Sequence, residues 1–171
     1  MQNYFELFDL ETSFFVDDEA LKKAYQAQVT RFHPDNFATK SQAEQLQALQ
    51  NTSLVNSAYT ALKTPLNRAS YLLNLEDVNP FDEKDTNMDA NFLVSQIELR
   101  EQLEGIKEQQ DNLALDDFIE RVQDFIRDNV ASISEAFTQS RDLQEIKTLV
   151  RELKFYEQLN KEANILIDEW L

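Results

Sequence analysis

Apolar residues recur along most of the chain every three or four positions, the spacing that places them on one face of an α-helix. Residues with high helix propensity (Ala, Leu, Gln and Glu) dominate these segments, while Gly and Pro are scarce. The helical segments of the first half are 4–8, 18–32, 41–62 and 65–73. Those of the second half are roughly 88–109, 112–137 and 141–170. The pattern therefore predicts an all-α protein.

Capping residues mark where several of these helices begin and end. Asp17 can accept hydrogen bonds from the free amides of the second helix, and Pro34 should end that helix just before it. Ser41 and Glu44 have the spacing of a capping box at the start of the third helix. Pro65 is placed to open the fourth. The third helix is expected to carry a stripe of Leu46, Leu49, Ser53, Asn56, Tyr59 and Leu62.

A polar, acidic stretch with one Pro and little periodicity separates the two sets of helices. We expect a compact helical domain over residues 1–75, a linker over 76–87 and a three-helix domain over 88–171. In the second domain, short polar turns join the long helical patterns, as between antiparallel neighbours in a bundle.

Composition narrows the possible functions. The chain of 171 residues has a formal net charge of −16, which opposes binding to phosphate backbones, so nucleic acid is not an expected partner. With one Gly and no Cys, it lacks the residues for phosphate-cradling loops, zinc fingers, cysteine-ligated clusters or disulfides. No apolar run exceeds three residues, and no basic stretch precedes an apolar segment at the start. We expect a cytoplasmic protein without membrane contact.

The negative charge is concentrated in the second half. Residues 1–75 carry six basic and eight acidic residues, a net charge of −2. Residues 76–171 carry ten basic and 24 acidic residues, a net charge of −14. The two halves are therefore expected to meet different partners, although solvated acidic faces that keep a bundle soluble would explain most of these carboxylates.

One loop combines unusual side chains. The only His of the chain, His33, is followed by Pro34 and Asp35 between the second and third helices. A general base oriented by a carboxylate would need a nucleophile and an oxyanion hole, for which the sequence has no signature. A metal site would have only carboxylates beside this His, suited to weakly bound calcium or magnesium. A simple capped turn is the remaining interpretation from the residues alone.

The residues around this tripeptide resemble the J-domain of J-type co-chaperones. The similar segments are Tyr4 to Phe8, Tyr25 to Asp35, Asn56 to Leu62, and Pro65 with Arg68-Ala69. The resemblance extends to the HscB family of co-chaperones, which function in bacterial iron–sulfur cluster assembly. The segments that carry it are Arg68 to Leu73, Phe92 to Val94 and Glu98 to Glu101. The likeness covers essentially the whole chain. It implies a J-domain hairpin with flanking short helices, followed by the three-helix bundle.

The resemblance implies a co-chaperone that is not an enzyme and carries no cofactor or metal. In this family the His-Pro-Asp loop and the basic face of the second helix dock on HscA, a DnaK-like ATPase, and stimulate ATP hydrolysis. The implied residues are His33, Pro34, Asp35, Lys22, Lys23 and Arg31. The basic face is thin, because Gln26, Ala27 and Asn36 stand where many relatives have basic residues.

The helical periodicity leaves a second group of apolar residues outside the bundle core. Leu93, Val94 and Ile97 fall away from the stripe of Phe92 and Leu99, and Phe155 points away from the inward face of the last helix. We expect an exposed apolar cluster with a polar rim, unless a broader core covers part of it. The resemblance implies that this cluster binds IscU, the scaffold protein. The implied residues are Leu93, Val94, Ile97, Glu98, Arg100, Glu101 and Phe155.

The sequence therefore predicts a monomeric co-chaperone that presents IscU to HscA. Two alternatives remain: a general J-domain co-chaperone of DnaK, and an acidic helical adaptor without a link to chaperones. The absence of a Gly/Phe-rich linker or a Cys-rich client module disfavours the first of these.

Overall fold

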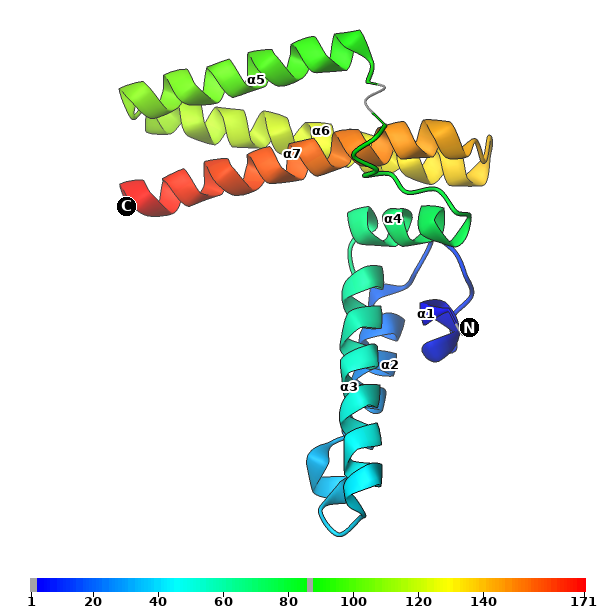
Figure 1. The fold of residues 1–171 in the computed structure, drawn as a ribbon. Coiled ribbons are helices and arrows are strands. Elements are labelled where there is room, and N and C mark those ends of the chain that lie inside the picture. The colour runs from blue at the N-terminus through cyan, green and yellow to red at the C-terminus, as the bar shows by residue number, and fades with distance from the viewer. Residues whose placement is uncertain (1–2, 86–87) are drawn as a thin grey trace. The chain divides into compact units, whose positions relative to one another are not determined.

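The computed structural model describes residues 3–85 and 88–171, and these form only helices, turns and loops (Figure 1). The expected all-α fold is confirmed. The described helices are α1 (Tyr4–Leu7), α2 (Asp18–Arg31), the 3-10 helix η1 (Pro34–Phe37), α3 (Gln42–Leu62), α4 (Pro65–Leu75), α5 (Ala90–Gln109), α6 (Asn112–Thr138) and α7 (Leu143–Trp170). Residues 1–2 and 86–87, which open the expected first domain and end the expected linker, lie outside the described residues.

The chain divides into two compact units, Met1–Leu72 and Leu73–Leu171. The boundary falls within α4, which begins at Pro65 and ends at Leu75. Among the described helices, none is long and apolar enough to cross a membrane.

In the N-terminal unit α2 and α3 run antiparallel, joined by η1 at the far end of the hairpin (Figure 1). Tyr25 on α2 stacks on Tyr59 of α3, with ring centroids 4.1 Å apart, and donates a hydrogen bond to Asn56 Oδ1 at 2.7 Å. Towards the loop, the Thr52 hydroxyl donates to the carbonyl of Phe32 at 3.4 Å. The core between α1, α2 and α3 consists of Phe5, Phe8, Leu21, Val55, Ala58 and Leu62.

The face that α3 buries agrees only in part with the expected stripe: Leu62 is buried and Tyr59 packs against the core. Leu46 and Leu49, expected on the packed side, are 55% and 64% exposed. The residues that α3 buries are Ala48, Val55, Ala58 and Leu62. Apolar residues surround much of this helix, so periodicity alone does not select the packed face. The buried alanines, Ala48 and Ala58, lie on the side that can approach neighbouring helices closely.

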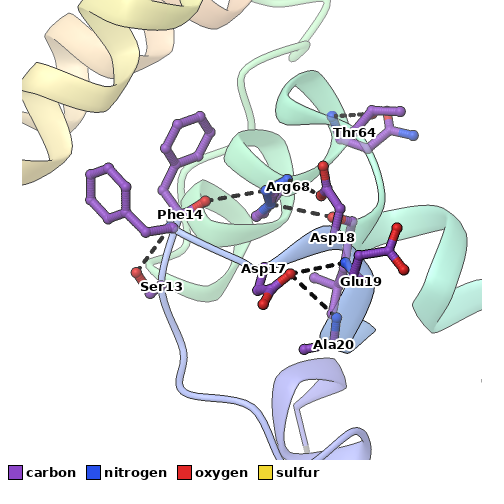
Figure 2. Close-up of polar contacts among 11 residues, drawn as sticks. Ser13, Phe14, Asp17, Asp18, Glu19, Ala20, Thr64 and Arg68 are labelled. Carbon is purple, nitrogen blue, oxygen red and sulfur yellow. Dashed lines mark hydrogen bonds and ion pairs between the residues drawn. The ribbon is translucent and has the colours of Figure 1, made fainter. Parts of the chain in front are cut away.

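Arg68 on α4 is buried among backbone carbonyls at the base of the hairpin. Its Nη1 donates to the Phe14 carbonyl and its Nε to the Leu62 carbonyl, both at 3.3 Å. Its Nη2 lies 3.9 Å from Asp18 Oδ1. Figure 2 shows the guanidinium pointing towards Phe14 and Asp18, beside the α2 N-cap formed by Asp17. Burial lowers the pKa of Arg68 and the charge of Asp18 opposes that shift. One side chain thus links α3, α4 and the start of α2.

The C-terminal unit contains the three long helices, with α6 and α7 in the most extensive contact and α5 packed on both. A buried apolar cluster in this unit consists of Leu99, Leu103, Leu115, Phe118, Ile119, Val122, Leu159, Ala163 and Leu166.

One polar group is buried in this bundle. Asn129 is only 6% exposed, and its Oδ1 accepts no hydrogen bond from the described residues. Its Nδ2 donates to Glu152 Oε2 at 3.5 Å. Burial raises the pKa of Glu152, and the charge of Asp89 raises it further. At neutral pH the Asn129–Glu152 pair therefore lowers the stability of the bundle.

We predict that Arg68→Ala destabilises the N-terminal unit by about 3 kcal/mol, because the buried carbonyls of Phe14 and Leu62 lose their donor. Urea denaturation followed by far-UV circular dichroism measures the change. The control Arg127→Ala removes only an exposed pair with Asp124 and should cost less than about 1 kcal/mol. Equal effects of the two substitutions would contradict the structural role of Arg68.

We predict that Glu152→Gln raises the melting temperature at pH 7. The pKa of Glu152 is raised in the folded state above its ordinary 4.5, so the folded protein holds more protons between these two values and loses stability as the pH rises through that window. The gain from Gln should therefore shrink as the pH falls towards 4.5. Calorimetry across this pH range tests it, with the exposed Glu120→Gln as control. A gain independent of pH would contradict the assignment.

Candidate functional site

The tripeptide His33-Pro34-Asp35 lies at the tip of the α2–α3 hairpin. Phe32 caps α2, and His33 is the N-cap of η1, whose first residue is Pro34. His33 Nδ1 accepts a hydrogen bond from the backbone N–H of Asp35 at 3.2 Å. Pro34 fits this position because its fixed φ suits the first turn of a helix and no partner is needed there for the missing N–H. The local sequence thus places all three side chains at an exposed corner.

The hydrogen bond to Nδ1 determines what the His33 ring offers to a partner. Since Nδ1 accepts, the neutral imidazole carries its proton on Nε2 and can donate only from there. The Asp35 carboxylate lies 3.6 Å from Nδ1 and is 91% exposed. An ion pair between them would require protonation of Nδ1, which would break the bond to the Asp35 N–H. The loop therefore presents an N–H donor and a carboxylate, a combination suited to recognition.

Side-chain to backbone hydrogen bonds hold the loop in this shape. Asn36 Nδ2 donates to the Thr30 carbonyl at 2.7 Å, which ties the loop back to α2. Gln45 Nε2 donates to the carbonyls of Phe37 and Lys40 at 3.1 and 3.2 Å, which ties it to α3. Sequence reasoning treated Asn36 only as a missing charge and did not consider Gln45. Their polarity and nearness to the tripeptide were the available signals.

The three basic residues implied for docking lie on α2, which leads into the loop. Lys22, Lys23 and Arg31 are all exposed. The Arg31 guanidinium lies over the Phe32 ring, 5.2 Å from its centroid, which places this charge next to the loop. The N-terminal unit therefore carries positive charge along α2 and a carboxylate at the tip.

A second exposed surface lies on α5. Leu93, Val94 and Ile97 are 48%, 54% and 52% exposed, as expected from the periodicity. Glu98 and Glu101 are also exposed on this helix. We call Leu93, Val94 and Ile97 the α5 patch. Three apolar side chains exposed together on one helix, with carboxylates beside them, form a surface suited to binding a protein.

Phe155, expected in the exposed cluster, is partly buried against the bundle core, in line with the alternative that a broader core covers part of the cluster. Its ring meets Phe92 edge-on with centroids 5.7 Å apart. Arg100 lies over the same ring at 5.5 Å and forms an ion pair with Glu162 on α7. The structure thus brings together Arg100 and Phe155, two implied scaffold-binding residues. Glu162, which holds Arg100, was missed because it lies 62 residues away in the sequence.

The segment before α5 is fastened to α7, and we call Phe81 to Asp85 the strap. The Asp85 carboxylate pairs with Lys147 and lies 3.7 Å from Arg151 Nη1, while Arg151 Nη2 donates to the Asp85 carbonyl at 3.1 Å. Lys154 Nζ lies 4.2 Å from the centroid of the Phe81 ring. From the sequence, this segment is predicted to be a plain linker, because the residues that it contacts on α7 lie more than 60 residues further along the chain.

No group of three or more potential metal-ligating side chains occurs among residues 3–85 and 88–171. The predicted site residues fall into two sets: the tripeptide with the α2 cations in the N-terminal unit, and the α5 patch with Arg100 and Phe155 in the C-terminal unit. Their chemistry is that of protein recognition in both units.

Comparison with known proteins identifies both units. Residues 3–71 match the DnaJ domain model, so the N-terminal unit is a J-domain. Residues 88–164 match the model of the HSCB C-terminal oligomerisation domain. A curated relative, the co-chaperone protein HscB homologue of Vibrio campbellii, is 38% identical over 99% of each chain. The chain belongs to the HscB family of J-domain co-chaperones, whose members are co-chaperones rather than enzymes.

Solved structures agree with this assignment. The chaperone HscB from Vibrio cholerae matches with a TM-score of 0.88 at 38% identity, over 99% of this chain and 100% of that one. Human co-chaperone HscB matches with a TM-score of 0.89 at 30% identity, over 96% of this chain and 82% of that one. The expected arrangement of a J-domain hairpin followed by a three-helix bundle is confirmed.

Proposed function

We propose that this protein delivers the iron–sulfur scaffold IscU to the DnaK-like chaperone HscA and stimulates the ATPase of that chaperone. The observation that carries the proposal is the exposed His33-Pro34-Asp35 loop on a J-domain joined in one chain to a bundle with an exposed apolar patch. A J-domain co-chaperone of the HscB family is consistent with a role in iron–sulfur cluster assembly.

HscA is proposed to dock on the loop and on α2. Lys22, Lys23 and Arg31 supply exposed positive charge, which favours encounter with an acidic surface and gives the complex a defined orientation. At the tip, His33 Nε2–H and the Asp35 carboxylate form specific contacts. Because hydrogen bonds to Thr30, Phe37 and Lys40 hold the loop, little conformational entropy is lost on docking.

IscU is proposed to bind the C-terminal unit at Leu93, Val94 and Ile97. The half-exposed side chains provide apolar area at the centre of the contact, and Glu98 and Glu101 contribute a polar rim. Arg100 and Phe155 support the edge of this surface, since the guanidinium lies on the ring.

The proposed roles follow the division of the sequence. Residues 1–75 serve the ATPase, 76–87 connect, and 88–171 carry the scaffold. The protein acts as a cytoplasmic monomer, and its partners are proteins, not nucleic acid or a membrane. DnaK as the ATPase partner, or an acidic adaptor without a chaperone partner, are the alternatives to be separated by experiment.

Replacing His33 should abolish stimulation of the HscA ATPase. Gln at position 33 has an amide donor and acceptor but no rigid ring, so it cannot hold an acceptor at the Asp35 N–H and a donor at the tip in the fixed geometry of the imidazole. Loss of such a central contact typically weakens binding by about 30-fold or more. We expect His33→Gln to leave ATP hydrolysis near its basal rate and IscU affinity unchanged. Steady-state ATPase assays with HscA, and in parallel with DnaK, measure this. Unchanged stimulation of HscA would refute the proposal, and stimulation of DnaK alone would favour the general co-chaperone.

Truncating the exposed patch should weaken IscU binding without affecting the J-domain. The double substitution of Val94→Ala with Ile97→Ala is expected to raise the dissociation constant at least about tenfold, because it removes apolar area from the centre of the contact. Isothermal titration calorimetry measures the affinity. The control Leu113→Ala truncates a Leu that is 82% exposed on α6 and should bind like wild type. Equal affinity of the double variant and the control would place the scaffold elsewhere.

A further inference from the structure

A surface pocket of about 490 Å³ opens beside the α5 patch, between the strap and α7. Its lining includes Phe81, Asp82 and Glu83 of the strap, Met88, Leu93 of the α5 patch and Arg151 of α7. Leu93 thus belongs both to the pocket and to the surface proposed for IscU. Because of this shared residue, a protein that covers the α5 patch also reaches the mouth of the pocket.

The strap wall of the pocket is attached to α7. Lys147 and Arg151 hold the carboxylate of Asp85, and Lys154 lies on the ring of Phe81. Lys147 and Arg151 are only 14% and 20% exposed, so these contacts are shielded from solvent. A wall anchored at both Phe81 and Asp85 keeps the pocket open without a partner, which lowers the cost of filling it.

The pocket combines apolar side chains with carboxylates on its strap side and cations on its α7 side. Phe81, Met88 and Leu93 provide the apolar lining, and Met88 is 40% exposed. Asp82 and Glu83 add exposed carboxylates on the strap side, while on the α7 side Arg151 shares the Asp85 carboxylate with Lys147, and Lys154 lies over the Phe81 ring. On the strap side, the complementary group is an apolar side chain with a Lys or Arg facing Asp82 and Glu83.

We propose that the scaffold-binding surface extends from the α5 patch into this pocket, which receives an apolar side chain of IscU flanked by a basic residue. The inference rests on the proposed function and adds a specificity element to it. The α5 patch supplies apolar contact area, and the pocket beside the strap selects which IscU side chain can insert. The strap is thereby part of the binding surface as well as a connection between domains.

The methionines of the chain provide a direct test. There are two, Met1 and Met88, so labelling the Met methyl groups with carbon-13 in the full-length protein gives two NMR signals. Met88→Leu assigns them. Saturating unlabelled IscU should shift or broaden the Met88 signal and leave that of Met1 in place. An unmoved Met88 signal at saturation would overturn the inference. A change of the Met88 chemical shift with the concentration of this protein, in the absence of IscU, would also overturn the inference, since a second copy of the chain would then occupy the pocket.

Affinity measurements separate this inference from the proposed function. We expect Met88→Ala, and Asp82→Lys combined with Glu83→Lys, each to weaken IscU binding by about tenfold, the charge reversal most strongly at low salt. Glu120→Lys is the control for added positive charge at an exposed position of α6. If the Val94 and Ile97 double variant weakens binding while the pocket variants stay within about twofold of wild type, the pocket inference fails alone. If none of these variants differs from wild type, the proposed function fails with it.

Discussion

The contacts of the Arg68 guanidinium are the constraint on which the J-domain depends. The carbonyl of Leu62 at the end of α3 and that of Phe14 before α2 both receive a hydrogen bond from this one group. Removing a guanidinium from water is costly, and this one is stabilised because Nε and Nη1 donate to these carbonyls and Asp18 lies nearby. A planar cation with several fixed donors can satisfy carbonyls from different elements at once, which an ammonium cannot do with the same geometry. The base of the hairpin is therefore held by directional bonds as well as by apolar packing.

A fixed base allows the tip to be exposed. The stack of Tyr25 on Tyr59 and the bond from Thr52 to the Phe32 carbonyl carry the pairing of α2 and α3 up to the loop. The loop has no buried residue in η1 and keeps its shape through hydrogen bonds to its own backbone. Its side chains thus remain available to a partner, and little stability is lost by exposing them.

Features that depend on neighbouring residues could be predicted from the sequence, and contacts between distant residues could not. Asp17 and Ser41 cap their helices as predicted, because a cap depends only on residues within one turn. The exposure of the α5 patch also followed from periodicity. Only part of the predicted α3 stripe packs: Leu62 is buried and Tyr59 stacks on Tyr25, but the packing of Leu46 and Leu49 was wrongly predicted. The buried Ala48 and Ala58 contribute little to a hydrophobic pattern although they decide how closely helices approach. The strap and the Arg100–Glu162 pair were missed for another reason: each joins residues about 60 positions apart, and no spacing rule relates them.

The strap also changes the meaning of the charge of the C-terminal half. Counted from the sequence, residues 76–171 have a net charge of −14 with ten basic residues. Lys147 and Arg151 are largely covered and share the Asp85 carboxylate, and Arg100 pairs with Glu162, so these three of the ten cations are engaged within the unit. The carboxylates beside the α5 patch, by contrast, remain exposed. Screening by salt reduces the steering effect of such charges more than it reduces apolar contact. Under the proposed function, an apolar patch framed by carboxylates separates two tasks: the charges are expected to accelerate encounter with a basic partner, and burial of Leu93, Val94 and Ile97 to determine how long that partner stays bound.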